Sequence, residues 1–550
     1  MNYKELADLL YPDVTMSIDD LEKKYPKRDL PDHSEVCRFA PSPTGRMHLG
    51  NLFASFMPEV FAHQSNGVFI LRIEDTDDKR AIENGINLIF NDLRAYNYQI
   101  DESPLTGGEY GPYIQTQRKD IYKVCAKYLV SIGRAYPCFC SEEDLNVMRE
   151  KQEKCKERIG YYGKYAKCRN LSIEEVKKHL ENGDKFVLRL KSMGDFEKKI
   201  VYTDLVKGRL ELPENDIDQV LIKSDGIPPY AFAHVVDDHF MRVTVVTRDD
   251  SYISSVPYHF EIWDAMGFTK PRFAHLLPLN IKDGETIRKI SKRKDPEASM
   301  SYYDELGYPT LAVIESLMTI INSNYEIWHT ENPDKSYLDF KFNPQKMSSS
   351  GALYDLDKLN NISKEIISKM SAEELFEQSY SWAKKYNENL VKIIEKDKEY
   401  YKGILNIERE KVKPRKDIAH YSDIEDLIWY MYDDIYNEKI SEYEWQKITD
   451  KKEITEILNK YIENYYTDES QEEWFNNVKK LAEELGYASN MKEYKKNPEN
   501  FKGNVADIAT VLRVALTSKS NTPDLYEIMK LFGKDRVENR YKELIKKLGQ

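Results

Sequence analysis

Residues 36–51 constrain the fold of this chain more than any other stretch. A short apolar run ends at a Pro- and Gly-containing turn (41–45), and apolar residues then recur every three or four positions over 49–61. This pattern predicts a strand, a tight turn and a helix. With His48 and Asn51 at its start, the predicted helix offers free N–H groups and the positive end of its dipole, which attract anions such as a polyphosphate.

A second predicted strand strengthens this interpretation. The apolar run at 68–73 has the length of a buried strand, and it ends in the acidic residues 74–77. A strand, a helix and a strand in succession form a parallel unit, and ligands bind such sheets at the carboxyl edge. The sequence therefore predicts an α/β fold with carboxylates beside a ligand site.

Three motifs resemble bacterial glutamyl-tRNA synthetase, a class I aminoacyl-tRNA synthetase: Arg38–Gly45, His48–Gly50 and Leu71–Asp77. The His48–Asn51 segment stands where that class carries His-Ile-Gly-His, and residues 111–118 are similar to the family's Gly-Pro-Tyr-x-Gln-x-x-Arg element. The resemblance runs from about residue 36 to the end of the chain. It implies a Rossmann-like doubly wound parallel-sheet catalytic domain, an inserted acceptor-binding domain and an all-α carboxyl-terminal anticodon-binding region.

The length of 550 residues is too great for one core, so several domains are expected. With the resemblance, we predict an N-terminal appendage of unknown role (1–34), the first catalytic half (35–135), the inserted acceptor-end-binding domain (136–218), the second catalytic half (219–299), a stem-contact domain (300–375) and the helical anticodon-binding domain (376–550).

The resemblance also implies a glutamate pocket, formed by Arg38, Ser42, Glu74, Tyr230 and Arg248. In it Arg248 meets the side-chain carboxylate of glutamate, and Glu74 meets the α-ammonium group. An arginine fork pairs bidentately with a carboxylate, so such a pocket rejects neutral side chains. After this arginine the family usually has Gly or Ala, two acidic residues and Trp. This chain has Asp249-Asp250-Ser251-Tyr252, so one carboxylate is lost at Ser251 and Tyr252 replaces the tryptophan.

A lysine motif supplies the second predicted set of catalytic groups. Lys289-Ile290-Ser291-Lys292-Arg293 resembles the class I Lys-Met-Ser-Lys-Ser signature, and the turn at 283–285 predicts that it lies on a loop. Residues 346–350 are similar in spelling but lack the second lysine. The resemblance assigns catalysis to His48, Lys289 and Lys292. It assigns ATP, accompanied by Mg²⁺, to Thr44, Gly45, His48, Gly50, Asn51, Lys289, Ser291 and Lys292.

Cysteines gather at the start of the predicted insertion. Two thiolates one residue apart can share a zinc ion that later ligands complete. The family's zinc-bearing members are similar, with a Cys-x-Cys pair, a tyrosine and a later cysteine, which implies Cys138, Cys140 and Cys168 here. Tyr161, Tyr162 and Tyr165 compete for the remaining place, as does Cys155. Free thiols are the alternative.

Composition limits the partners and the compartment. A formal net charge of -13 argues against nonspecific coating of nucleic acid, whereas specific binding depends on local basic patches such as 409–416. The sequence has no apolar run of membrane-spanning length and no secretory signal at its start, so we expect a cytoplasmic protein without a membrane partner. We expect it to be a monomer.

The predicted function is ATP-dependent attachment of L-glutamate to tRNA(Glu) through glutamyl-adenylate, releasing AMP and pyrophosphate. A glutaminyl-tRNA synthetase is one alternative, although its first motif usually reads Pro-Glu-Pro-Asn-Gly where this chain has residues 41–45 as Pro-Ser-Pro-Thr-Gly. A catalytically impaired tRNA-binding homologue is the other, suggested by Ser251 and Tyr252. Whether tRNA(Gln) is also charged stays open.

Overall fold

The computed structural model describes residues 2–76, 82, 84–291, 293–347, 352–465 and 470–549. The chain forms two compact units, one of residues 1–302 and 314–355, the other of residues 303–313 and 356–550. Across the described ranges, no helix combines the length and apolar character needed to span a bilayer.

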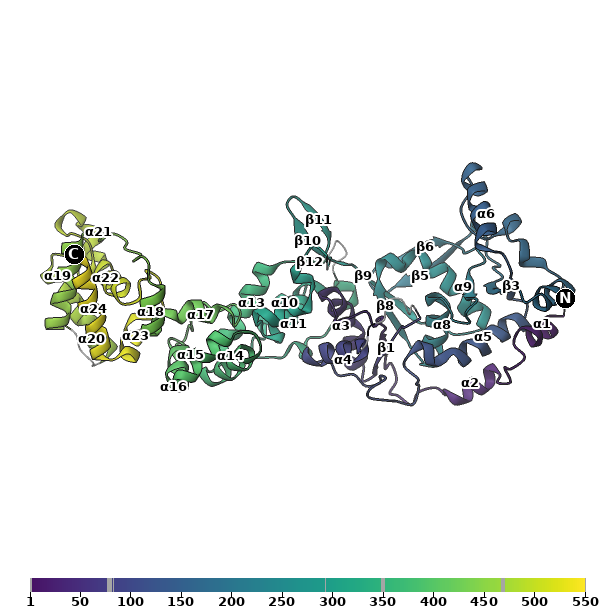
Figure 1. The fold of residues 1–550 in the computed structure, drawn as a ribbon, viewed down its shortest axis with the longest axis horizontal. Helices are drawn as coiled ribbons and strands as arrows, with labels where there is room; N and C mark the ends of the chain where they lie inside the picture. Colours follow the sequence, from purple (N-terminus) through teal and green to yellow (C-terminus); the bar gives the residue numbers. More distant parts are fainter. Residues whose placement is uncertain are drawn as a thin grey trace. The chain divides into compact units, whose positions relative to one another are not determined.

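A four-stranded parallel sheet forms the centre of the first unit (Figure 1). Its strands, in the order β2-β1-β8-β9, are β2 (Val68–Leu71), β1 (Val36–Phe39), β8 (Val245–Asp249) and β9 (Arg272–Leu276). Helix α3 (Leu49–Gln64) connects β1 to β2 and packs on the sheet. The predicted strand, turn, helix and strand are thus confirmed, and so is the α/β class.

Helices cover both faces of this sheet. Ile70 packs in a core with α5 (Lys119–Ser131), α8 (Tyr230–Phe240) and α9 (Val256–Met266). The preceding residue, Phe69, instead lies against the Tyr98 ring, which also contacts Phe56 of α3. Successive strand side chains point to opposite faces, so α3 covers one face and α5, α8 and α9 the other (Figure 1).

A smaller antiparallel sheet follows β1 and β2 in the chain. It joins β3 (Ala135–Cys138), β4 (Val187–Leu190) and β7 (Val220–Ile222). Between β4 and β7 in the sequence, β5 (Lys199–Asp204) and β6 (Gly208–Pro213) form a separate hairpin. Its helices are α6 (Glu142–Lys154) and α7 (Ile173–Glu181). Strand β7, at the start of the predicted second catalytic half (219–299), pairs with β4, so it does not belong to the parallel sheet.

Lys289 is the last residue of a strand, and the described residues of the lysine motif that follow it lie on a loop, as predicted. Strands β10 (Leu279–Asp283) and β11 (Thr286–Lys289) form a hairpin, and β12 (Ala352–Tyr354) pairs with β10. The predicted turn is present, because Gly284 has φ of +62°, a value that glycine adopts without strain. The residues after Gly284 form β11, which pairs with β10 and ends at Lys289, the first residue of the motif.

The N-terminal appendage packs on helices of the first unit. Helix α1 (Tyr3–Leu10) packs on α5, and α2 (Ile18–Lys24) lies on the same helix. Beyond α2, the Arg28 guanidinium donates to both carboxylate oxygens of Glu102, at 2.7 and 2.9 Å, and to the Met241 carbonyl oxygen. Met241 caps the carboxyl end of α8, so the appendage holds that end in place.

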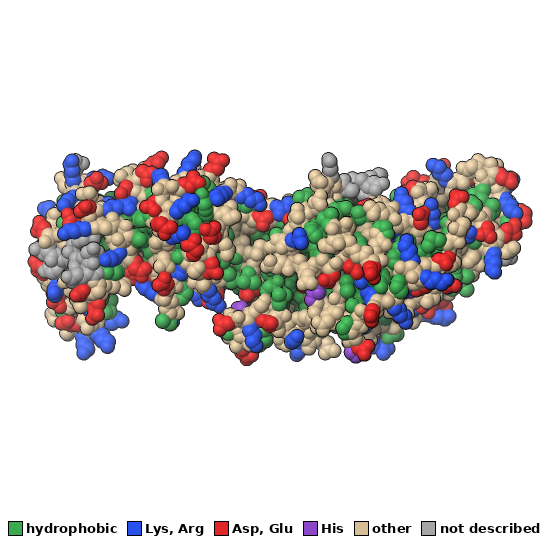
Figure 2. Space-filling model, turned by 90° about the horizontal axis from the view of Figure 1, so that it is seen from below, with side chains coloured by type: hydrophobic (Ala, Val, Ile, Leu, Met, Phe, Trp, Pro, Cys, Tyr) green, Lys and Arg blue, Asp and Glu red, His purple; other side chains and the backbone are tan. Residues whose placement is uncertain are grey.

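The remaining described segments are mostly helical. They comprise α4 (Gly85–Ala95), α10 (Met300–Leu306), α11 (Thr310–Ile321), α12 (Tyr325–Glu331), α13 (Leu356–Lys369), α14 (Ala372–Tyr386), α15 (Glu388–Lys396), α16 (Lys398–Asn406), α17 (Asp423–Ile428), α18 (Asp433–Lys439), α19 (Lys451–Lys460), α20 (Gln471–Glu484), α21 (Met491–Lys496), α22 (Val505–Thr517), α23 (Leu525–Phe532) and α24 (Lys534–Leu548). The last twelve belong to the second unit and enclose its core. Figure 2 shows basic and acidic side chains interspersed on the face that it draws.

Candidate active site

Polar side chains lie at the carboxyl ends of the four parallel strands, on the face that α5, α8 and α9 cover. Along each strand an apolar residue of this face is in the core, at Val36, Ile70, Val246 and Phe273. Two positions further along, the same face carries Arg38, Arg72, Arg248 and His275, all of them buried. Arg72 lies just beyond the end of β2. Three arginines at the ligand-binding edge of a parallel sheet favour an anionic ligand.

Asp238 of α8 joins two of these arginines. Its Oδ1 atom accepts from Arg38 Nε at 3.0 Å and from Arg72 Nη1 at 2.7 Å, and its Oδ2 atom lies 2.9 Å from His234 Nδ1. Burial favours protonation, but the two guanidinium groups hold the pKa of Asp238 well below its usual range. The carboxylate is therefore ionised and fixes both arginines.

The neighbouring Asp237 ties α8 to the start of α5. Its carboxylate accepts from Arg118 Nε at 2.6 Å, from Gln115 Nε2 at 3.0 Å and from the Tyr122 hydroxyl at 2.8 Å. Gln115 and Arg118 are the polar positions of the Gly-Pro-Tyr-x-Gln-x-x-Arg element. This element thus supports the helix that carries Tyr230.

Glu74 reaches the same site from the end of β2. Its Oε1 atom accepts from Arg72 Nη2 at 3.1 Å. Burial raises the pKa of Glu74 to about 7, although Arg72 and Arg38 oppose the change. Burial and the charge of Glu74 also raise the pKa of Tyr230. Glu74 is thus a carboxyl group poised to change its charge near neutral pH.

Arg248 is held by imidazoles. Its Nε atom donates to His275 Nε2 at 3.0 Å and its Nη1 atom bonds His259 Nδ1 at 3.1 Å, while Nη2 is buried and makes no hydrogen bond within the described chain. The Tyr252 ring lies 5.6 Å from the guanidinium and 5.5 Å from the Tyr230 ring, so Tyr252 lines the site.

The predicted ATP residues lie at the start of α3. His48 caps this helix, because its Nδ1 accepts from Asn51 N at 3.1 Å, and the Asn51 side chain accepts from His48 N at 3.4 Å. A Cβ added to Gly50 would lie 2.9 Å from His48 Cε1, so the imidazole covers Gly50. Gly45 has φ of +132° in the turn.

Two predicted residues of the turn are not joined to the arginines. The Ser42 carbonyl accepts from Thr44 N at 2.8 Å, and both residues are exposed. Within the described part of the chain, no hydrogen bond links either of them to Arg38, Glu74 or Arg248. The Pro41 carbonyl accepts from Glu74 N at 3.0 Å, so Ser42 directly follows a residue that contacts the end of β2.

Lys289 is brought to the carboxyl edge of β8. Its Nζ atom lies 2.9 Å from Oδ2 of Asp249, the residue after Arg248. Despite burial, this pairing helps to hold the pKa of Asp249 below its usual value. The exposed ammonium is thus anchored next to the arginine site. Ser291 follows the strand, and Lys292, the other predicted catalytic lysine, lies outside the described residues.

The cysteine cluster lies away from these residues, at the end of β3. The Sγ atoms of Cys138, Cys140 and Cys168 lie within 4.8 Å of one another. The Tyr161 hydroxyl is 3.5 Å from Cys138 Sγ and 3.4 Å from Cys140 Sγ, and it accepts from Cys168 N at 3.0 Å. Hydrogen bonds from the other two thiols lower the pKa of Cys138. Among the competing candidates, Tyr161 occupies the cluster, while Cys155 is exposed at the end of α6.

The sequence motifs do not point to Asp237, Asp238, His259 or His275. A signal for the first two was present, since a helix that is otherwise apolar carries His234 and Asp238 one turn apart with Asp237 between them. Buried acidic groups on such a helix need partners. For the two histidines, the sequence carries no local signal.

The comparisons with known proteins agree with this geometry. A family model described as "tRNA synthetases class I (E and Q), catalytic domain" matches residues 35–361, and one described as "Anticodon binding domain" matches residues 374–545. The parallel sheet and the polar groups at its carboxyl edge are therefore the catalytic domain of a class I aminoacyl-tRNA synthetase, followed by a helical anticodon-binding domain.

Proteins of similar length narrow the class further. The chain is 46% identical to the glutamate–tRNA ligase of Acetivibrio thermocellus and 44% identical to that of Clostridium perfringens, in both cases over 99% of this chain and 100% of the relative. A crystal structure of a glutamate tRNA ligase from Elizabethkingia meningosepticum, in complex with its amino acid, superimposes with a TM-score of 0.75 at 25% identity, over 93% of this chain and 99% of that one. This chain belongs to the glutamate–tRNA ligase family.

Proposed function

We propose that this protein attaches glutamate to tRNA(Glu) in two steps that use ATP. The glutamate α-carboxylate attacks the α-phosphorus of ATP and pyrophosphate leaves. A terminal ribose hydroxyl of the tRNA then takes the glutamyl group and AMP leaves. Neither step needs a protein nucleophile, so positioning and charge stabilisation supply the rate. Relatives named glutamate–tRNA ligase match this chain over their full length, which favours glutamate over glutamine as the amino acid.

Arg248 carries the proposal, because it is a buried cation that lacks an anionic partner among the described residues. The side-chain carboxylate of glutamate supplies that partner, whereas the amide of glutamine does not. Glu74 in its ionised form would hold the α-ammonium group. Arg38, which pairs with Asp238, and Tyr230, whose ring lies beside the Tyr252 ring, complete the pocket.

The phosphates of ATP would lie at the start of α3. This helix end attracts anions, and the imidazole of His48 stands beside Asn51 and Gly50. Lys289 and Lys292 would neutralise the charge that develops on the phosphates, together with Mg²⁺ that accompanies ATP. For this, the ammonium group of Lys289 would leave the Asp249 carboxylate and pair with a phosphate instead.

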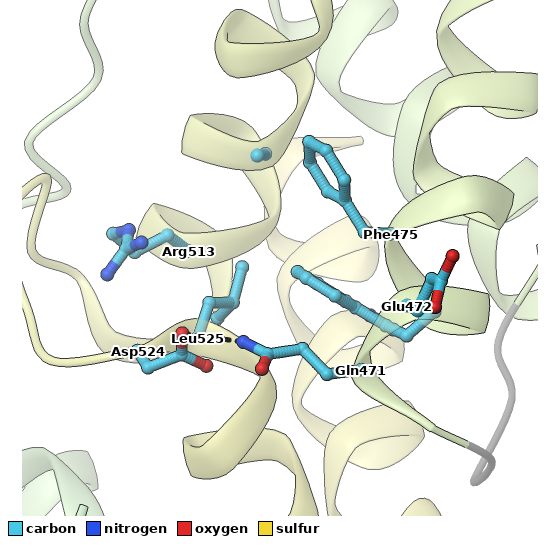
Figure 3. Close-up of a pocket in the computed structure, with 8 residues that line it drawn as sticks. Gln471, Glu472, Phe475, Arg513, Asp524 and Leu525 are labelled. Carbon is cyan, nitrogen blue, oxygen red and sulfur yellow. Dashed lines mark hydrogen bonds between the residues drawn. The ribbon is translucent and has the colours of Figure 1, made fainter. Parts of the chain in front are cut away.

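A cavity in the second unit fits a nucleotide of the tRNA. It has a volume of about 460 Å³ and is lined by Gln471, Glu472, Trp474, Phe475, Ala509, Arg513, Asp524 and Leu525. Figure 3 shows Arg513 and Asp524 on one side of it and Phe475 on the other. Aromatic rings stack on bases, and polar groups such as these bond base edges. Because this unit matches an anticodon-binding family, we assign the cavity to an anticodon base.

The cysteine cluster fits a structural zinc ion. A tetrahedral site with Zn–S distances of about 2.3 Å separates its sulfur atoms by about 3.8 Å. Cys140 Sγ and Cys168 Sγ lie 3.7 Å apart. With Cys138 and the Tyr161 hydroxyl, they offer four ligand atoms and would fix the end of β3 to the segment that follows α6.

Aminoacylation of purified tRNA(Glu) and tRNA(Gln) with labelled glutamate or glutamine tests the function. We expect glutamyl-tRNA(Glu) to form in an ATP-dependent reaction, with little or no glutaminyl-tRNA. Charging of tRNA(Gln) with glutamate in the same assay would widen the tRNA specificity without changing the chemistry. Formation of glutaminyl-tRNA alone, or of no product, would contradict the proposal.

A further inference from the structure

Arg248 differs from the other arginines of the site in the kind of group that holds it. Arg38, Arg72 and Arg118 each form an ion pair with Asp237 or Asp238. Arg248 is 7% exposed and forms no such pair among the described residues. Its hydrogen-bond partners are two imidazoles, and its buried Nη2 atom has no acceptor in the part of the chain that the structure describes. Burying a charge without an opposite charge is costly, so the arrangement calls for an anion from outside.

The first imidazole is fixed from the neighbouring strand. His275 of β9 stands directly opposite Arg248 of β8 in the parallel register. Its Nδ1 atom lies 2.6 Å from Oδ2 of Asp204, the last residue of β5, and both groups are almost fully buried. A carboxylate at Nδ1 keeps the proton on that atom, which leaves the Nε2 lone pair for the Arg248 N–H group.

Asp204 is itself held firmly. Its Oδ1 atom accepts from the backbone N–H groups of Val206 and Lys207, each at 2.9 Å, and the backbone N–H of His275 also reaches the carboxylate at 3.2 Å. The imidazole ring of His275 therefore separates the Asp204 carboxylate from the Arg248 guanidinium. A carboxylate of the insertion thus controls the orientation of an imidazole in the amino-acid site.

The second imidazole comes from α9. His259 Nδ1 bonds Arg248 Nη1, which places the His259 proton on Nε2. Burial, with the positive charge of Arg248 nearby, lowers the pKa of His259 and of His275. Both rings are accordingly neutral acceptors. A neutral imidazole accepts a hydrogen bond from a guanidinium, as a carboxylate does, but it does not cancel the charge.

We propose that His259 and His275 are positioning residues that keep Arg248 free of an internal anion, and that Asp204 fixes the imidazole of His275 for this task. The inference rests on the proposed function and deepens it. Specificity for glutamate then depends on withholding a carboxylate from Arg248 as much as on the arginine itself, because an internal carboxylate would compete with that of the substrate.

The test compares two nearly isosteric substitutions, His259→Glu and His259→Gln. Both perturb packing alike, but only the glutamate brings a carboxylate to Arg248. In pyrophosphate exchange with tRNA present, we expect the glutamate KM of His259→Glu to exceed that of His259→Gln by about tenfold or more, with similar ATP KM values. The matched control is the exposed His179–Asp184 pair, where Glu and Gln in place of His179 should give equal glutamate KM values.

Equal glutamate KM values for the two His259 variants would overturn the proposal. If His259→Glu does not fold, as judged by its thermal unfolding, Asp204→Asn decides. Its amide can donate to His275 Nδ1 and turn Nε2–H toward Arg248, so the glutamate KM should rise while the ATP KM stays. A wild-type glutamate KM in that variant overturns the proposal as well. Wild-type protein that fails to charge tRNA(Glu) would instead contradict the proposed function.

Discussion

The charge of Glu74 makes the site sensitive to pH, because burial of this carboxyl group moves its titration to near neutral pH. Its pKa is raised to about 7 by burial, so the free enzyme carries a neutral carboxyl group below that pH. An α-ammonium group binds the ionised form, and each pH unit below the pKa lowers the ionised fraction about tenfold. We therefore expect the glutamate KM to rise as the pH falls from 8 to 6, while the ATP KM changes little.

Initial rates of pyrophosphate exchange across this pH range measure the effect. Glu74→Gln should raise the glutamate KM at pH 8 and flatten its pH profile. A wild-type profile in this variant would assign the titration to another group.

Glu74 also affects how the stability of the folded state depends on pH. Because the folded pKa exceeds the usual 4.5, this carboxyl group destabilises the folded state as the pH rises from about 4.5 to 7.

Lys292 is the residue on which we expect the chemical step to depend most. A lysine that meets the phosphates more strongly in the transition state than in bound ATP affects kcat rather than binding. Lys292→Ala should lower kcat for glutamate activation by roughly 10² to 10³. Lys346→Ala, in the motif of similar spelling, should keep the wild-type rate. The opposite outcome would transfer the role to that second motif.

At the scale of elements, α8 is held at its carboxyl end by the N-terminal appendage. The ion pair of Arg28 with Glu102 is largely buried, with 8% and 12% of the side chains exposed, and Glu102 also accepts from the Tyr113 hydroxyl at 2.8 Å. Among the described residues, Arg28→Ala would leave the buried Glu102 carboxylate with the Tyr113 hydroxyl as its one donor, and the Met241 carbonyl would lose the Arg28 guanidinium. We expect a loss of about 3 to 5 kcal/mol in the free energy of unfolding.

Urea denaturation measures this loss. Lys177→Ala provides the control, because the Lys177–Glu5 ion pair also attaches the appendage to the rest of the chain but is exposed. Its removal should change the unfolding free energy very little. Equal effects of the two substitutions would mean that burial of the Arg28 pair contributes nothing.

The cysteine cluster predicts a second result at this scale. Protein purified without chelators should contain close to one zinc ion per chain by elemental analysis, and Cys138→Ser should lose it. Cys155→Ser should retain the metal, because Cys155 is exposed and outside the cluster. Metal-free wild-type protein would identify the cluster as free thiols.

Local patterns predicted the elements well and the contacts between them poorly. The strands at β1 and β2 and helix α3 follow from apolar periodicity, which depends on adjacent residues. The pairing of Asp204 with His275 spans 71 residues, and that of Arg38 with Asp238 spans 200. Such pairs follow from strand order rather than from a motif. The choice of Tyr161 over Tyr162 likewise depends on which ring turns toward the sulfur atoms, which spacing does not reveal.

At the scale of the whole molecule, each unit has a core of its own. Leu512 lies fully buried in the core of the second unit, whereas the residues proposed to bind glutamate lie in the first. Leu512→Ala should destabilise the second unit by about 2 to 5 kcal/mol. Calorimetry should then show one transition at a lower temperature, with pyrophosphate exchange unchanged at 25 °C. A uniform shift of all unfolding would indicate that the units unfold together.

The appendage has a consequence for the order in which the molecule assembles. Arg28 bonds a carbonyl group 213 residues further along the chain, and Glu22 pairs with Arg242, 220 residues away. At synthesis rates of about 5 to 20 residues per second, these partners leave the ribosome roughly 10 to 40 seconds after the appendage does. The appendage is thus made before the residues that hold it. Its helices α1 and α2 expose their apolar faces to solvent until α5, on which they pack, has been made.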